Sequence, residues 1–168
     1  MRLLCISFLK KSNDGIKLYK PLYEDLWFRK QFLSDEETMS YNHAWGGTID
    51  FSEEKWPDWY KKWVCCKDNS RFYRYLINND KEFVGEAAYY RDDLSQRYIA
   101  NIIVYSKYRR LGYGRAGLQL LCGAAKEKGL AYLYDNIAID NTSVSLFWQC
   151  GFEEVSRTEE IITVFKRL

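Results

Sequence analysis

The sequence predicts a protein of the α/β class, of the α+β type, with a mixed, mostly antiparallel central sheet of about six to seven strands flanked by about four helices. Three observations lead to this prediction. Apolar residues recur at helical spacing in the first third of the chain, alternate with polar residues between 71 and 105, and then mark helix, strand, helix and strand in turn. The length of 168 residues and a 47% hydrophobic composition suit a single domain over residues 1–168 with a sizeable core.

The first strand-like segments stand on either side of a tight turn. Two apolar runs, 3–9 and 16–20, flank Asn13-Asp14-Gly15, and an Asp-Gly pair favours a hairpin. The first run is short and no small-residue cleavage site follows it, which argues against a secretory signal peptide. No run reaches the roughly 18 apolar residues that span a membrane. We therefore expect a strand or hairpin here and no membrane partner.

Two short helices joined by a loop are expected next. Apolar residues near helical spacing predict a helix within 22–41, and Gly46-Gly47 predicts a loop in the segment 42–51. The segment 53–64 predicts the second helix, because its aromatic residues share one helical stripe and Pro57 suits a first turn.

From residue 71 the apolar pattern changes to a period of two, which is typical of strands. Short polar turns separate these strands, so neighbouring strands should run antiparallel. The predicted strands cover 71–78, 82–90 and 97–105. The middle of the chain therefore predicts an antiparallel meander.

The C-terminal part alternates between helix and strand. Residues 115–128 are rich in helix formers and end before Gly129, which is a good helix stop. Asp140 or Asn141 is placed to cap a second helix. The remaining predicted elements are a strand over 130–139, a helix over 141–150 and one or two strands over 152–168.

The charge and the cysteines narrow the function classes. A net charge of +2 is too small to indicate a nucleic-acid partner, and no run of like charges forms a binding tail. The five cysteines show no C-x-x-C spacing, so reduced thiols and a cytoplasmic location are expected. His43 is the only histidine, and we therefore expect neither a metal site nor a Ser-His triad.

A glycine-rich turn with two arginines predicts an anion site. Arg109 and Arg110 precede GYGRAG, residues 112–117, where a helix is predicted to begin. Backbone N–H groups at such a turn, the positive end of a helix and two guanidinium groups suit a phosphate or pyrophosphate. GYGRAG also matches the dinucleotide fingerprint G-x-G-x-x-G, but that motif belongs to an early βαβ unit, and here it follows a meander late in the chain. The Gly-Lys-[Ser/Thr] of a P-loop does not occur.

Two motifs stand together in the second half of the chain. The first, [Gln/Arg]-x-x-Gly-x-[Gly/Ala], is present at 109–114, and the second, a short helix that ends in Gly-Phe, is present at 146–152. At this spacing they resemble the GNAT superfamily of acyl-CoA-dependent N-acetyltransferases. The motifs cover residues 70–168, and the order of the predicted elements extends the resemblance to nearly the whole chain.

The resemblance implies that acetyl-CoA is the cofactor, used as co-substrate, and that backbone N–H groups of the turn hold its pyrophosphate. It implies that pantetheine pairs with the strand before the turn, and that the N–H of Val104 polarises the thioester carbonyl. The last helix would line the cofactor, with Asn141 or Asp140 at its start. The implied cofactor-binding residues are Ile102, Ile103, Val104, Arg109, Arg110, Leu111, Gly112, Tyr113, Gly114, Arg115, Asn141 and Phe147.

The chemistry of the family asks for a catalytic base, because an alkyl amine with a pKa near ~10.4 is mostly charged at neutral pH. Glu86 is the first candidate, since an acidic residue amid apolar neighbours on a central strand needs a reason to be there; an outward-facing glutamate is the alternative. Asp135 is the second candidate. The family's tyrosine before Gly-Phe, which protonates the leaving thiolate, is replaced by Phe147, so Tyr134 is a candidate for that role or else a core residue.

The acceptor is expected to lie against the two N-terminal helices and the loop between them. The loop combines aromatic residues with two glycines, which suits a pocket wall, although packing of the loop is the alternative. Family members often dimerise, so a homodimer that pairs the final strand region is a further expectation. The residues expected around the acceptor are Tyr41, His43 and Trp45 on one wall and Tyr89, Tyr90 and Asp92 on the other.

The leading hypothesis is an N-acetyltransferase that moves an acetyl group from acetyl-CoA to a primary amine of a small molecule or protein by direct attack in a ternary complex. The alternative is a non-catalytic acyl-CoA-binding module, which the phenylalanine at position 147 favours. A nucleotide-phosphate enzyme with a Rossmann-like site is a third hypothesis, and it predicts binding of NAD without preference for CoA.

Overall fold

The computed structural model describes residues 15–168, so the predicted apolar run 3–9 lies outside the described residues. Its centre is a seven-stranded sheet in the order β1-β2-β3-β4-β5-β7-β6. Every neighbouring pair is antiparallel except β4 and β5, which are parallel. The strands are β1 Ile16–Tyr19, β2 Arg71–Asn78, β3 Phe83–Arg91, β4 Tyr98–Val104, β5 Tyr132–Ala138, β6 Glu153–Arg157 and β7 Ile161–Arg167.

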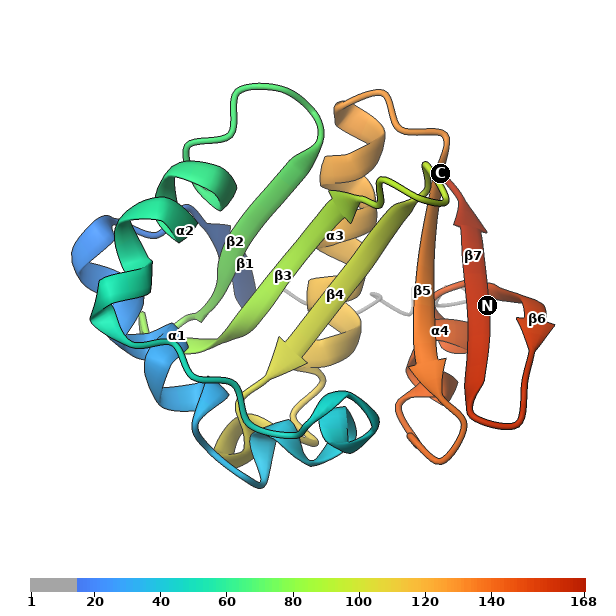
Figure 1. Cartoon of the computed structure of the whole chain (residues 1–168), viewed down its shortest axis with the longest axis horizontal. Helices are drawn as coiled ribbons and strands as arrows, with labels where there is room; N and C mark the ends of the chain where they lie inside the picture. Colours follow the sequence, from blue (N-terminus) through green and yellow to red (C-terminus); the bar gives the residue numbers. More distant parts are fainter. Residues whose placement is uncertain (1–14) are drawn as a thin grey trace, which may run out of the picture.

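Helices cover both faces of this sheet, and this arrangement confirms the predicted fold class. Helices α1 and α2 lie on one face and α3 and α4 on the other (Figure 1). Among residues 15–168 no helix combines the length and the apolar character needed to cross a bilayer. The helices are α1 Leu26–Leu33, α2 Trp56–Trp63, α3 Tyr113–Glu127 and α4 Val144–Gln149, with shorter 3-10 turns at η1 Tyr23–Asp25, η2 Thr38–Trp45, η3 Glu53–Lys55 and η4 Ser106–Tyr108.

Each face of the sheet has its own hydrophobic core. On the α3 side, Leu118 and Leu121 of the helix are fully buried with Leu76 of β2 and Leu133 of β5. The core on the α1 and α2 side is mainly aromatic, with fully buried Phe28, Phe32, Tyr73 and Tyr75. The described cysteines Cys65, Cys66, Cys122 and Cys150 form no disulfides.

The predicted helix over 22–41 is interrupted in the structure. Helix α1 ends at Leu33, and Asp35 then accepts hydrogen bonds from the backbone N–H and the hydroxyl of Thr38, at 2.8 and 2.5 Å. These side-chain hydrogen bonds precede a separate helical turn, and helix propensity along the chain does not reveal the interruption. The new turn, η2, continues into the predicted loop and ends at Gly46, whose φ of +103° suits glycine.

The sheet opens between β4 and β5. These strands share a single registered pair, Ile99 with Tyr134, whereas β4 pairs with β3 over its whole length. Figure 1 shows that β4 and β5 diverge towards their C-terminal ends. A strand edge without a neighbour leaves backbone N–H and C=O groups free for another partner.

A bulge in β3 lies across β4 from this opening. The β2–β3 register shifts between Leu76 and Ile77, next to Gly85. A Cβ on Gly85 would lie 2.2 Å from the carbonyl oxygen of Ile103 and 3.0 Å from the Cα of Val104. Only glycine allows β3 and β4 to approach this closely.

Replacing Gly85 with alanine is therefore expected to lower the free energy of unfolding by at least about 2 kcal/mol. The control is Gly123→Ala in α3, where a Cβ meets open space and alanine favours the helix, so stability should rise by up to about 1 kcal/mol. Urea midpoints of the two variants check both signs. A Gly85→Ala midpoint equal to that of the wild type would contradict the close approach of the two strands.

Candidate active site

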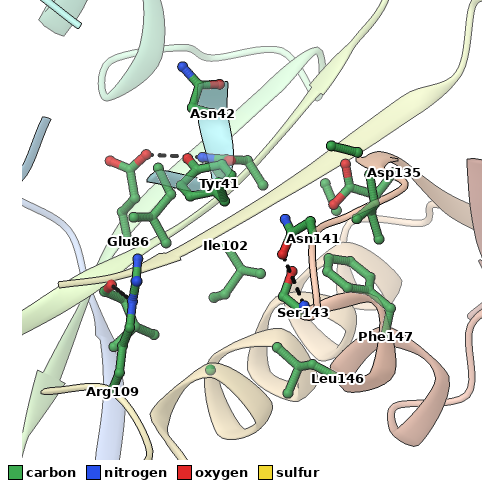
Figure 2. Close-up of a pocket in the computed structure, with 18 of the residues that line it drawn as sticks. Tyr41, Asn42, Glu86, Ile102, Arg109, Asp135, Asn141, Ser143, Leu146 and Phe147 are labelled. Atoms are coloured by element: carbon green, nitrogen blue, oxygen red, sulfur yellow. Dashed lines mark hydrogen bonds between the residues drawn. The ribbon is translucent and has the colours of Figure 1, made fainter. Parts of the chain in front are cut away.

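A deep cavity of about 1340 Å³ lies where β4 and β5 separate. The turn before α3 and the start of α4 form its wall on one side, and η2 and β3 lie on the other (Figure 2). Residues of α2 and β2 also line the cavity. Four of the expected site residues, Tyr89, Asp92, Leu111 and Tyr134, do not line it. Those that do are Tyr41, His43, Trp45, Glu86, Tyr90, Ile102, Ile103, Val104, Arg109, Arg110, Gly112, Tyr113, Gly114, Arg115, Asp135, Asp140, Asn141 and Phe147.

The free edge of β4 faces this cavity. The N–H of Tyr105 donates to the carbonyl of Val84 on β3 at 2.9 Å. Because backbone groups alternate sides along a strand, the N–H and C=O groups of Ile102 and Val104 turn the other way, towards β5. The carbonyl of Val104 accepts a hydrogen bond from Nε of Arg109 at 3.2 Å, which agrees with that direction. The N–H of Val104 therefore faces the gap.

The turn after β4 delivers the N-terminus of α3 to the same gap. Gly112 precedes the helix with a φ of +84°. Because it is a glycine, it has no side chain that could cap the first helical N–H groups. Those groups have no partner within the helix and carry partial positive charge. Arg110 and Arg115 are exposed on either side and add full charges. The place of Gly114 is close-packed, since a Cβ there would lie 3.3 Å from Leu146 of α4.

The guanidinium of Arg109 is bound to the protein's own backbone. Its guanidinium donates to three backbone carbonyls, those of Val104, Glu37 and Thr38, at 3.2, 3.1 and 2.6 Å. Most of its hydrogen-bonding capacity is therefore used within the protein. Arg109 ties the start of η2 to the end of β4, and Arg110 and Arg115 are the arginines of the turn that remain open to a ligand.

The start of α4 lies on the same wall of the cavity as the turn. The side chain of Asn141 accepts the N–H of Ser143, the N-cap residue of α4, at 2.9 Å, whereas Asp140 lies 3.1 Å from Nε2 of His43 in η2. That contact links the two walls of the cavity. Phe147 is 3% exposed and packs edge-on against Phe152, so it lines the cavity with carbon atoms only.

Glu86 is buried in a network of hydrogen bonds. Its carboxylate forms an ion pair with Arg29 of α1 and accepts the hydroxyl of Tyr73. Asn101 donates to its other oxygen at 3.0 Å. Burial alone would lower the pKa of Arg29, but the Glu86 carboxylate outweighs it and holds that pKa above its ordinary value. With three donors on two oxygens, Glu86 is poorly placed to accept a proton from a substrate.

Asp135 is the carboxyl group of the cavity with the fewest partners. It lines the gap on β5, and the backbone N–H of Asn136, at 2.7 Å, is its one hydrogen-bond donor among the described residues. Burial raises the pKa of its carboxyl well above the ordinary value. A carboxylate whose proton affinity is raised in this way, facing a cavity, has the properties of a general base.

Tyr134 lies outside the cavity, which removes the basis for the expected role as proton donor. Side chains alternate along β5, so the neighbour of Asp135 points to a different surface. Tyr134 stacks on Phe165 with ring centroids 5.8 Å apart, and the guanidinium of Arg97 lies 4.6 Å above its ring. It lines a separate small hollow near the rim of the sheet.

Tyr89 was expected beside the acceptor, but its side chain points to the opposite face of the sheet. It is fully buried on the α3 side and stacks on Phe72, with centroids 5.3 Å apart. Its neighbour Tyr90 faces the opposite side and lines the cavity.

Aromatic side chains from η2 and α2 complete the wall opposite the turn. Tyr41 and Trp45 come from η2, and Trp59 and Trp63 from the aromatic stripe of α2. Burial first, and then the carboxylates Glu86 and Asp135, raise the pKa of Tyr41 above its ordinary value, so its hydroxyl keeps its proton at neutral pH.

Sequence reasoning missed the partners of Glu86, of which Arg29 is the clearest example. Arg29 occupies the apolar face of α1, three residues from Leu26 and from Phe32. A charged residue at helical spacing within an apolar stripe is a signal for a buried ion pair, although it does not name the partner.

The split in the sheet, the open N-terminus of α3 and a large cavity lie together, an arrangement that suits a phosphorylated ligand. The model of the acetyltransferase (GNAT) family matches residues 19–152, and the chain belongs to that family. Membership supports an acyltransferase. Among residues 15–168 no cluster of three or more His, Cys, Asp or Glu side chains is arranged to hold a metal ion.

Solved structures agree with this fold. A GNAT-family acetyltransferase from Bacillus anthracis is 16% identical, with a TM-score of 0.74 over 92% of this chain and 95% of the other. The spermidine N-acetyltransferase of Vibrio cholerae, solved with CoA and spermine, is 19% identical, with a TM-score of 0.74 over 92% and 96%. The GNAT domain of S. lividans PAT is 13% identical, with a TM-score of 0.73 over 91% and 89%. No curated protein matches the sequence significantly.

Proposed function

We propose that the protein transfers an acetyl group from acetyl-CoA to a primary amine of a small molecule or a protein, by direct attack of the amine in a ternary complex. The observation that carries the proposal is the meeting of three features in one cavity: the free edge of β4 at Val104, the uncapped start of α3 at Gly112 and the Asp135 carboxyl.

The residues along one wall fit acetyl-CoA. The N–H groups after Gly112, with Arg110 and Arg115, suit the pyrophosphate. The free edge of β4 at Ile102 and Val104 suits the amides of pantetheine, and acetyl-CoA supplies an activated acyl group there. The N–H of Val104 is directed into the gap, where it can stabilise the oxyanion that forms when a thioester carbonyl is attacked.

Asp135 is the base in this proposal, in place of Glu86. An ammonium group entering from the aromatic wall loses a proton to the Asp135 carboxylate, directly or through a water molecule, and the neutral nitrogen then attacks the acyl carbon. Glu86 instead holds Arg29, Tyr73 and Asn101 in place behind the acceptor site. A homodimer through the exposed edge strand β6 stays a prediction.

A non-catalytic acyl-CoA-binding module is the second candidate. It is favoured by Phe147, which offers no proton to a departing thiolate. Such a module would bind CoA and release no thiol with any amine.

The first test measures the melting temperature with acetyl-CoA, CoA, NAD or ATP added separately, because a ligand that binds only the folded state raises it. Thiol release from acetyl-CoA is then followed with a panel of amines. We expect a shift with the CoA species and thiol release with at least one amine. A shift without thiol release would favour the binding module, and a larger shift with NAD would contradict the assignment of the turn at Gly112.

The double variant Arg110→Gln/Arg115→Gln is expected to weaken CoA binding by about tenfold or more, because two charge-assisted hydrogen bonds to phosphate are lost. The loss should shrink as salt is raised, since these groups are exposed. Arg167→Gln, an exposed charge on β7 away from the cavity, is the control and should leave the affinity unchanged. Calorimetric titration with CoA at two salt concentrations measures both effects, and equal affinities for the double variant and the control would contradict this placement of the pyrophosphate.

A further inference from the structure

The wall of the cavity that faces away from the turn is rich in aromatic side chains. They come from η2, α2, β2 and β3, so four separate elements contribute to one surface. Trp45 is 49% exposed, which leaves it accessible to a ligand. The aromatic residues of this wall are Tyr41, Trp45, Trp59, Trp63, Tyr73 and Tyr90.

The aromatic wall contributes one carboxyl group to the lining of the cavity, that of Glu86. It is already engaged, because Glu86 forms an ion pair with Arg29. Asp135 and Asp140 lie on β5 and on the segment that leads into α4, away from the aromatic wall. A ligand that extends a second ammonium group along the aromatic wall therefore finds no unpaired carboxylate there.

Three of these six aromatic rings, those of Trp59, Trp63 and Tyr73, already have a cation beside them. The Arg29 guanidinium lies 4.6 Å from the ring centre of Trp59 and 5.3 Å from that of Tyr73, and the Arg71 guanidinium lies 5.5 Å from that of Trp63. Rings that already hold an arginine have little cation–π attraction left for an ammonium group, and the arginine repels it.

We propose, building on the N-acetyltransferase function above, that the acceptor is a monoamine carried on an aromatic or other apolar body, and that the cavity discriminates against polyamines. The single amine reaches Asp135 and gives up its charge there, while its apolar body packs against the exposed ring of Trp45. A second ammonium group on the same molecule would lie among aromatic side chains beside Arg29, without a counter-ion.

The test compares three ligands by calorimetric titration, with and without saturating CoA. Hexylamine and 1,6-diaminohexane have the same chain and differ in one ammonium group, and phenethylamine replaces the chain with a ring. We expect hexylamine to bind at least about tenfold more tightly than 1,6-diaminohexane, and phenethylamine to bind more tightly still. Equal or tighter binding of the diamine, or no binding of any of the three, would overturn the proposal.

A variant pair locates the binding. Trp45→Gln is expected to weaken binding of phenethylamine several-fold and to leave that of 1,6-diaminohexane unchanged. The control is Trp148→Gln, an equally exposed tryptophan (46% exposed) that does not line the cavity, and it should change neither. Unchanged binding of phenethylamine by Trp45→Gln would also overturn the proposal. Because these titrations need no turnover, absence of thiol release would count against the acetyltransferase function alone.

Discussion

Replacing Asp135 with asparagine is expected to lower kcat for amine acetylation by about a hundredfold to ten-thousandfold and to leave the affinity for CoA unchanged. Asparagine keeps the size of the side chain and can still accept the N–H of Asn136, but it cannot take a proton from the attacking amine. Initial rates of thiol release and calorimetric titration with CoA measure the two quantities.

Glu86→Gln is the comparison that decides between the two carboxyl groups. If Asp135 is the base, Glu86→Gln keeps the rise of kcat/KM with pH, whereas Asp135→Asn abolishes it. In the wild type, kcat/KM should rise at pH values above ~3.9, the ordinary pKa of Asp, because burial raises the pKa of Asp135. Loss of the rise in Glu86→Gln, with the rise kept in Asp135→Asn, would return the role to Glu86.

The same carboxyl group should make the stability of the protein depend on pH. The folded state holds the Asp135 proton at pH values where the unfolded chain has released it, so stability falls as pH rises through the raised pKa. The Asp135→Asn variant lacks this dependence and should be more stable than the wild type at the high end of the range. Urea midpoints measured at several pH values check the sign.

The second large effect concerns the buried ion pair. Arg29→Met is expected to lower the free energy of unfolding by about 3–5 kcal/mol, because Glu86 then keeps a buried charge without its cation. The double variant Arg29→Met/Glu86→Gln removes both charges and should recover at least about 2 kcal/mol of that loss. Urea unfolding of the two single variants and the double variant completes the cycle. A double variant less stable than Arg29→Met would show that the charge of Glu86 is stabilised by its neighbours without Arg29.

Much of the fold could be predicted because its signals are local. Strand β2 coincides with the predicted segment 71–78, and the alternation of side chains also placed β3 and β4 to within a residue or two. Proline and glycine mark helix starts that depend on backbone geometry alone. Pro57 lies in the first turn of α2, and Gly112 precedes α3 with a positive φ. Most of the predicted cofactor residues lie on one cavity because the turn between β4 and α3 is continuous in sequence.

The rest depends on contacts between residues far apart in the chain. The pairing of Arg29 with Glu86 joins α1 to β3, and no periodicity within either element encodes it. Tyr89 and Tyr90 are adjacent and chemically alike, so only the register of β3 decides which of them reaches the cavity. Arg109 has the residue type of a phosphate ligand, and two of the carbonyls that accept its hydrogen bonds lie about seventy residues earlier in the chain.

The bonds of Arg109 have a consequence for how two substrates would influence each other in the proposed reaction. Its guanidinium joins Glu37 and Thr38, at the start of η2, to Val104, at the end of β4. In the proposed complex the amine lies against η2 and CoA lies along β4, so this arginine connects the two binding sites. Thermodynamic reciprocity requires that if bound CoA raises the affinity for an amine, the amine raises the affinity for CoA by the same factor.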